Sequence, residues 1–224
     1  MKNQKKVVWS RLDQISLDIE FLLISVIQGV ALASLSGVAI RPMEMLQWQS
    51  FPYIVTGFLL ILIFWSGAII HALSFIDWPL DLIHTFLYFF ASFIEVIAFS
   101  QINNPFNWFV ILLFFQIVAG VLYLYDMKLI KKHKVRFGRN SAKKELFEHI
   151  YNQQKNELRS FVPFSIIYSI VAVLAILIFP EYFINKGYHL FLISGQLILS
   201  LVFLKNAIGT FKIRSLLLSE SEGN

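Results

Sequence analysis

Five polar or ionisable residues recur at helical spacing within one apolar segment of the chain. They are Asp81, His84, Tyr88, Ser92 and Glu95, separated by three, four, four and three residues. Because each residue of an α-helix turns by about 100°, these spacings place all five side chains along one stripe. An ionisable group in membrane hydrocarbon costs roughly 2.5–3.5 kcal/mol, so we expect this intramembrane polar stripe to face protein or water.

The stripe contains groups that can take up protons or cations. Asp81, His84 and Glu95 are its titratable members, and rows of such residues serve as proton relays in transporters. Glu95 has two interpretations: a carboxyl that packs in its neutral form, or a contact for a cation. One interpretation of the whole stripe is therefore a small proton-coupled transporter that uses Asp81, His84 and Glu95.

A second group of ionisable residues surrounds the turn that precedes the stripe. His71 lies about six residues before the 77–79 turn and His84 about five after it, so an antiparallel hairpin places them at similar depth, beside Asp77 and Asp81. Such a group can bind a metal or relay protons, or its members hydrogen-bond one another and cap the hairpin. Since no HExxH-like spacing supports a metal, the sequence assigns none. It also assigns no cofactor and no catalytic residue, because a nucleophile–base pair and a phosphate-binding glycine loop are both lacking, so we expect no enzyme.

The elements that position these residues follow from composition. Of the 224 residues, 57% are hydrophobic and 15% charged, whereas soluble domains have about 45–50% and 25%. Such a chain needs a bilayer as its solvent.

The net charge of +5 does not indicate nucleic-acid binding, because the basic residues concentrate in the first eleven residues and in one later segment. The absence of cysteine excludes thiolate chemistry and cysteine-ligated metals.

Six apolar segments predict an all-α integral membrane protein with six transmembrane helices. Each is about 20 residues long, which at 1.5 Å per residue crosses a hydrocarbon core of roughly 30 Å. The predicted spans are 19–40, 52–75, 80–100, 108–126, 161–180 and 189–209. The resulting organisation is a cytoplasmic N-terminal segment 1–18, helices one to four within 19–127, a basic cytoplasmic loop 128–160, helices five and six within 161–210, and a cytoplasmic tail 211–224.

Basic residues predict the orientation. Ten lysines and arginines lie between Lys128 and Arg159, and the N-terminal segment and the tail carry others, whereas the alternate connections are nearly bare. Basic residues stay on the cytoplasmic side, so both termini and the 128–160 segment are predicted to be cytoplasmic. The small size and bare outer loops favour a bacterial inner membrane.

The basic 128–160 segment leaves two interpretations open. Residues 141–159 have a helical composition and lie close to anionic headgroups, which suits a helix on the membrane surface. The alternative is a solvated, positively charged loop. A cytoplasmic protein or anionic lipid is the possible partner in either case. This segment supports a non-conducting membrane anchor, sensor or effector as an alternative function.

Arg11, Ser16 and Asp18 open the first span, and the pairs Pro52-Tyr53, Gly57-Phe58 and Phe64-Trp65 follow in the second. This pattern resembles the transmembrane protein 175 family of six-helix potassium channels. That family opens its first helix with Arg-x-x-x-Phe-Ser-Asp; here Arg11 and Ser16 match, Ile15 replaces the Phe, and Asp18 comes one residue late. In the second span, the Pro-Tyr, Gly-Phe and Phe-Trp pairs that end at Trp65 are similar to the family's pattern, with its following His found only at His71. The likeness covers roughly residues 11–100.

The resemblance implies a cation channel, with potassium as the expected monovalent ion, assembled from several copies around the first helix. It implies a homotetramer in which Leu22 forms a hydrophobic gate and Ser25 offers hydroxyls to a partly dehydrated ion. The inner-end motif residues that it implies are Arg11, Ser16, Asp18, Trp65 and His71. An oligomeric cation channel is thus the predicted function, with the anchor and the proton-coupled transporter as alternatives.

Overall fold

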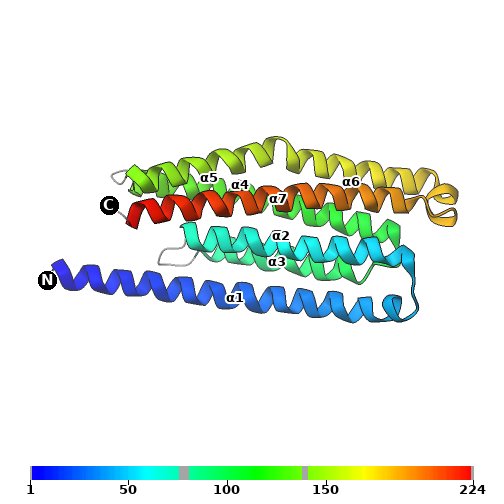
Figure 1. Cartoon of the computed structure of the whole chain (residues 1–224), viewed down its shortest axis with the longest axis horizontal. Helices are drawn as coiled ribbons and strands as arrows, with labels where there is room; N and C mark the ends of the chain where they lie inside the picture. Colours follow the sequence, from blue (N-terminus) through cyan, green and yellow to red (C-terminus); the bar gives the residue numbers. More distant parts are fainter. Residues whose placement is uncertain (1, 76–80, 138–140, 223–224) are drawn as a thin grey trace.

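The computed structural model describes residues 2–75, 81–137 and 141–222, and within these ranges it contains helices and no strand. Figure 1 shows long helices that run side by side along one axis. In chain order they are α1 (Lys2–Glu44), the short 3₁₀-helix η1 (Trp48–Ser50), α2 (Phe51–Phe75), α3 (Leu82–Phe99), α4 (Pro105–Phe137), α5 (Ser141–Arg159), α6 (Phe161–Ile178), the π-helical turn η2 (Glu181–Asn185) and α7 (His189–Glu222).

Six helical stretches are long and apolar enough to cross a membrane, which confirms the predicted all-α membrane architecture. They are Gln14–Glu44, Trp48–Ala72, Leu82–Phe99, Pro105–Lys131, Glu148–Ile178 and His189–Gly209. Large apolar side chains point outward from these helices: Phe191 is 76% exposed, Phe86 68% and Phe93 62%. Apolar surface of this kind suits hydrocarbon as the surrounding solvent. The chain is an integral membrane protein.

Capping residues and prolines set the points where several helices begin. Asn104 accepts a hydrogen bond from the Asn107 N–H (3.1 Å) ahead of α4, and Pro105 occupies the first helical position, where its missing N–H is not needed. Pro163 lies in the first turn of α6, where a proline's missing N–H is tolerated, so the break between α5 and α6 at Ser160 comes three residues before a residue that would disrupt a continuous helix.

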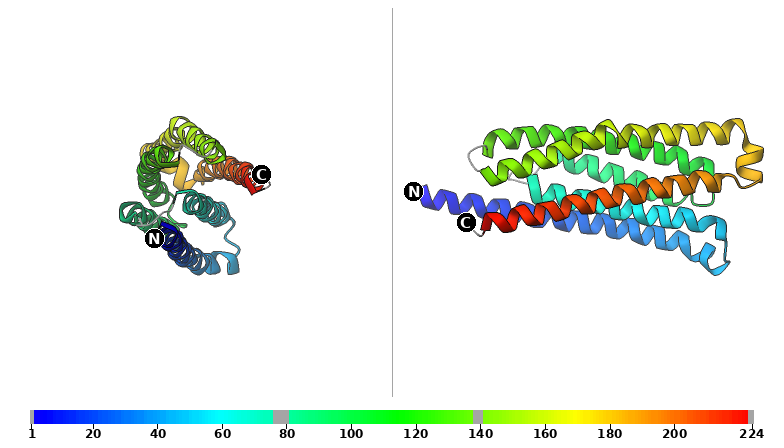
Figure 2. Two further views of the ribbon diagram at one scale, coloured as in Figure 1. Left: turned by 90° about the vertical axis from the view of Figure 1, so that its left-hand side faces the viewer. Right: turned by 45° about the horizontal axis from the view of Figure 1, so that its top comes forward.

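The helices pack as two groups that share α2 and α4. α1 packs against α2 and α3, and α3 packs against α4; on the other side α7 packs against α2, and α6 against α4. Figures 1 and 2 show α1 at one edge of the bundle. Both termini lie at the same end (Figure 1), called the terminal end below. The opposite end, where α1 leads into α2 and α6 into α7, is called the far end.

The 128–160 segment, for which the sequence leaves a surface helix and a solvated loop open, is helical over residues 128–137 and 141–159. α4 continues to Phe137, and α5 starts at Ser141 and packs against α4, α6 and α7. The Lys131 ammonium lies 5.7 Å from the centre of the Tyr151 ring, which links α4 to α5. α5 is therefore part of the bundle.

A core of aromatic residues fills the far end. Trp108, Phe99 and Phe109 are fully buried there, and the Tyr53 ring meets that of Trp108 edge to face at 5.3 Å. The Tyr53 hydroxyl pairs with His189 Nδ1 at 2.9 Å. This core takes residues from α1, α2, α3, α4, α6 and α7.

Candidate functional site

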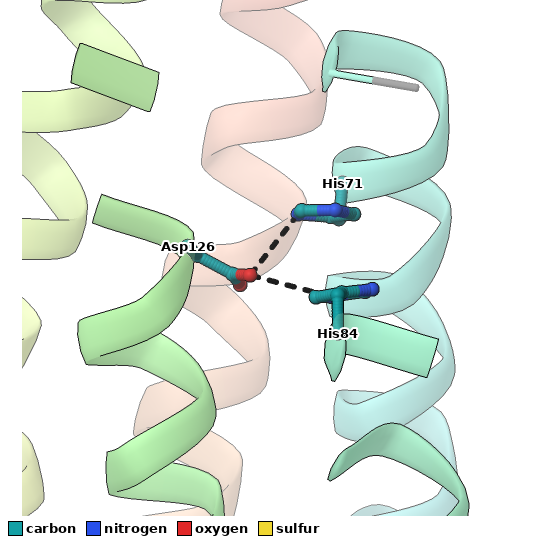
Figure 3. Close-up of side chains that lie close together, drawn as sticks. All are labelled: His71, His84 and Asp126. Carbon is teal, nitrogen blue, oxygen red and sulfur yellow. Dashed lines mark ion pairs between the residues drawn. The ribbon is translucent and has the colours of Figure 1, made fainter. Parts of the chain in front are cut away.

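Three buried side chains from three helices meet in the terminal half of the bundle. His71 comes from α2, His84 from α3 and Asp126 from α4 (Figure 3). Asp126 Oδ1 lies 3.3 Å from His71 Nδ1 and 3.2 Å from His84 Nε2. The two imidazole rings are stacked, with centroids 3.7 Å apart and planes 10° apart. These three residues are called the His–His–Asp cluster.

Asp81 holds two members of this cluster in place. It caps α3 by accepting hydrogen bonds from the N–H groups of Ile83 and His84, both at 3.1 Å, so the first turn of α3 is fixed where His84 lies. The Tyr125 hydroxyl donates to both Asp81 oxygens at 2.9 and 3.0 Å, and Tyr125 adjoins Asp126. Asp81 therefore ties the start of α3 to the part of α4 that carries the cluster's carboxylate.

The environment of Asp81 favours its charged form. Partial burial raises the pKa of its carboxyl, but the hydrogen bonds from the His84 N–H, the Tyr125 hydroxyl and the Ile83 N–H outweigh this effect. The pKa of Asp81 consequently lies below its ordinary value, and Asp81 is ionised at neutral pH.

A second carboxylate approaches the cluster from α1. Glu20 Oε1 lies 4.0 Å from His84 Nδ1, on the side of the ring away from Asp126, and both side chains are buried. His84 thus lies between two acids from two different helices. Glu20 and Asp126 were not among the predicted site residues. The signal that singled out the stripe, an ionisable residue in an apolar segment, also applies to both.

A cavity of about 190 Å³ adjoins the cluster. α2, α4, α6 and α7 supply most of its walls, with α3 and α5 contributing from the terminal half. A space of this size holds several water molecules. The histidines and acidic residues that line it are His71, His84, Asp126 and Glu157, and the described lining includes no lysine or arginine. The cavity is therefore lined by acidic and neutral groups.

Amide and hydroxyl side chains complete the polar part of this lining. The Gln154 side-chain amide donates to Asp126 Oδ2 at 3.3 Å, and the Gln153 amide donates to Glu157 Oε1 at 3.0 Å. Ser200 and Gln196 face the cavity from α7. The remaining lining is mostly apolar.

The five residues of the predicted polar stripe lie in different surroundings in the structure. Asp81 is half-buried, and the other four members are buried. His84 and Tyr88 line the cavity, and Tyr88 also accepts a hydrogen bond from Gln28 of α1 at 2.9 Å. Ser92 and Glu95 lie farther along α3, outside the described lining, and neither carboxylate oxygen of Glu95 has a hydrogen-bond partner among the described residues. The stripe therefore does not form a single site.

The residues assigned by resemblance to the gate and inner-end motif are also dispersed. Leu22 is 64% exposed, and Ser25 and Asp18 are exposed too, all on the outward face of α1. Trp65 is 43% exposed on α2, whereas His71 belongs to the cluster. Ser16 is buried. The Arg11 side chain and Asp77 lie outside the described residues.

Comparison of the chain with protein-family models, with curated proteins and with solved structures finds no match.

Proposed function

We propose that this chain is a membrane transporter of small cations whose binding site is the cavity between α2, α4, α6 and α7. The observation that carries the proposal is the charge of that cavity: Asp126 and Glu157 line it without a described lysine or arginine. Ionisable residues inside membrane spans mark ion and substrate pathways. A cleft with acidic groups in its lining and low-dielectric walls attracts cations and repels anions.

The far-end core favours a transporter over an open pore through the same bundle. Trp108, Phe99 and Phe109 are fully buried there, together with Tyr53. A cation in the cavity would meet this packed layer before it reached the far side. Passage therefore requires the far end to open while the terminal end closes, which is the alternating access of a transporter. The basic residues near the terminal end would place that end in the cytoplasm.

A potassium channel assembled from several copies around α1 is the second candidate, as the family resemblance implies. The outward face of α1 supports it, because Leu22, Ser25 and Val26 are exposed on that face and are free to contact other copies. In that arrangement the ion would pass between subunits, and the cavity within each bundle would play no part in conduction.

Cation flux into liposomes separates these candidates through two matched carboxylate variants. Asp126→Asn removes one of the two cavity carboxylates, the one in the His–His–Asp cluster, and Asp18→Asn makes the same change on the exposed face of α1. The transporter proposal expects cation uptake in the wild type and in Asp18→Asn, with uptake reduced to the level of empty liposomes in Asp126→Asn. Potassium currents that increase in Leu22→Ala and persist in Asp126→Asn would instead establish the channel. Absence of flux in the wild type for every cation tested would favour the anchor or effector.

A further inference from the structure

We propose that the cation is a divalent first-row transition-metal ion, held by His71 Nδ1, His84 Nε2 and Asp126 Oδ1. The claim that this ion is transported rests on the proposed function. The claim that the ion binds here rests only on the geometry of the His–His–Asp cluster. One ligand atom from each of the three residues lies within 4.8 Å of the other two. All three residues are buried, so an ion bound there would exchange water for protein ligands.

The spacing within the cluster matches that of a tetrahedral metal site. Zinc lies 2.0–2.1 Å from histidine nitrogens and a similar distance from carboxylate oxygens, which puts neighbouring ligand atoms of a tetrahedron about 3.3 Å apart. The two nitrogen–oxygen distances are 3.3 and 3.2 Å. The two rings are stacked with their planes 10° apart, and the lone pair of an imidazole nitrogen lies in the plane of its ring. Both rings must therefore turn about their side-chain bonds for His71 Nδ1 and His84 Nε2 to bind one ion beside Asp126 Oδ1.

The types of ligand atom select the class of metal. Imidazole nitrogen suits zinc, copper, nickel and iron, whereas magnesium and calcium prefer sites made wholly of oxygen. Two of the three donors here are imidazole nitrogens that point to one carboxylate oxygen (Figure 3). An alkali-metal ion gains little from such ligands, since it too is bound mainly by oxygen.

The residues around the cluster provide the support that metal ligands usually have. Metal-bound histidines commonly direct their second ring N–H to a carboxylate, which fixes the tautomer and orients the ring. Glu20 Oε1 is the group that faces His84 Nδ1, and the 4.0 Å between these atoms is an ion-pair distance that is longer than a hydrogen bond. The Gln154 amide donates to Asp126 Oδ2 at 3.3 Å, which leaves Oδ1 directed at the two histidines.

The cavity supplies the position that the protein leaves open. Three protein ligands occupy three corners of a tetrahedron, and His71, His84 and Asp126 all line the cavity, so a water molecule can take the fourth position. Closed structural sites have four protein ligands, whereas an open position lets a ligand or water exchange. An ion held in this way can enter and leave through the cavity, as transport requires.

Cobalt binding to the full-length protein in detergent tests the site. Co²⁺ is the probe because a tetrahedral nitrogen–oxygen site gives it strong visible absorption. We expect one equivalent of Co²⁺ per chain with such a spectrum, displaced by Zn²⁺. His71→Gln, His84→Gln and Asp126→Asn should each weaken binding by more than the ~10–100-fold that changes outside the ligand set cause. The matched control is His189→Gln, which alters a buried histidine paired with Tyr53 in the far-end core and should leave the spectrum unchanged.

Either of two results would overturn the metal site: no tetrahedral spectrum in the wild type, or equal weakening in His189→Gln and the cluster variants. The wild-type spectrum decides the question even where a cluster variant fails to fold. Transport is judged separately by flux. Tetrahedral Co²⁺ binding without flux of any cation would keep the site and overturn transport. Flux of a monovalent cation that needs Asp126, without Co²⁺ binding, would keep transport and overturn the metal.

Discussion

The imidazole rings of His71 and His84 lie nearly parallel, 3.7 Å apart, and each turns a nitrogen toward the same oxygen of Asp126. The two rings come from helices that follow one another in the chain, and the carboxylate comes from a third. An ion bound at this point would join α2, α3 and α4 through its own coordination bonds. Occupancy of the site should therefore affect the stability of the whole bundle.

Metal should raise the thermal stability of the wild-type protein, and a chelator should remove that increase. A ligand that binds only the folded state stabilises it by about 2.7 kcal/mol at a concentration of 100 times its Kd. Thermal unfolding in detergent with Zn²⁺, and with Zn²⁺ followed by excess EDTA, measures the effect. Asp126→Asn should unfold at the same temperature in both solutions. An equal rise in Asp126→Asn would show that Zn²⁺ acts elsewhere.

Glu20→Gln should weaken metal binding about tenfold while leaving the three ligands in place. The expected loss follows from the role of a carboxylate behind a metal-bound histidine, whose removal costs 10–100-fold in affinity. The absorption of bound Co²⁺, titrated against a competing chelator, measures the change. Asp18→Asn, two residues earlier on the exposed face of α1, should bind Co²⁺ like the wild type. If Glu20→Gln binds as tightly as the wild type, Glu20 does not act on His84.

The buried hydrogen bond between Gln28 and Tyr88 should couple α1 to α3 by about 0.6 kcal/mol, the average found for such bonds within membranes. Its donor and acceptor atoms are 2.9 Å apart. Gln28→Leu and Tyr88→Phe, singly and together, form a double-mutant cycle in which unfolding in detergent is measured. Strictly additive effects would mean that this bond makes no net contribution.

Asp81→Ala should destabilise the protein by about 1 kcal/mol, because the first turn of α3 loses the side chain that caps it. Asp81→Asn should cost less, since an asparagine oxygen can still accept from the N–H groups of Ile83 and His84. Comparing the two unfolding curves separates the stability that the capping hydrogen bonds contribute from the stability that the negative charge contributes. Equal destabilisation by both substitutions would assign the effect to the lost carboxylate and its bonds from Tyr125.

Hydropathy was sufficient to predict the six spans because a bilayer imposes both a length and an apolar surface on each helix. Counting residues on either side of one turn also predicted that His71 and His84 lie at similar depth, and their rings are in contact in the structure. Both inferences depend on local geometry, which the sequence carries directly.

The remainder of the site depends on which helices become neighbours. Helical periodicity relates Asp81 to His84 on one helix, but it does not show that α4 brings Asp126 beside them, or that α1 adds Glu20. The pairing of α3 with α4 and α1 arises from packing along whole helices. For the same reason the sequence placed the titratable stripe in one group, whereas the structure separates Glu95 from the cavity that His84 lines.

The most direct test of the central claim is whether the cavity between α2, α4, α6 and α7 admits water and a cation. The chain has no cysteine, so a single Ser200→Cys variant reports on the cavity wall and Ser92→Cys on a buried position outside it. We predict that a charged, water-soluble thiol reagent labels Ser200→Cys and that the cation identified by flux slows this labelling, while Ser92→Cys stays unreactive. A Ser200→Cys protein as unreactive as Ser92→Cys, or one labelled at the same rate with and without cation, would contradict the account.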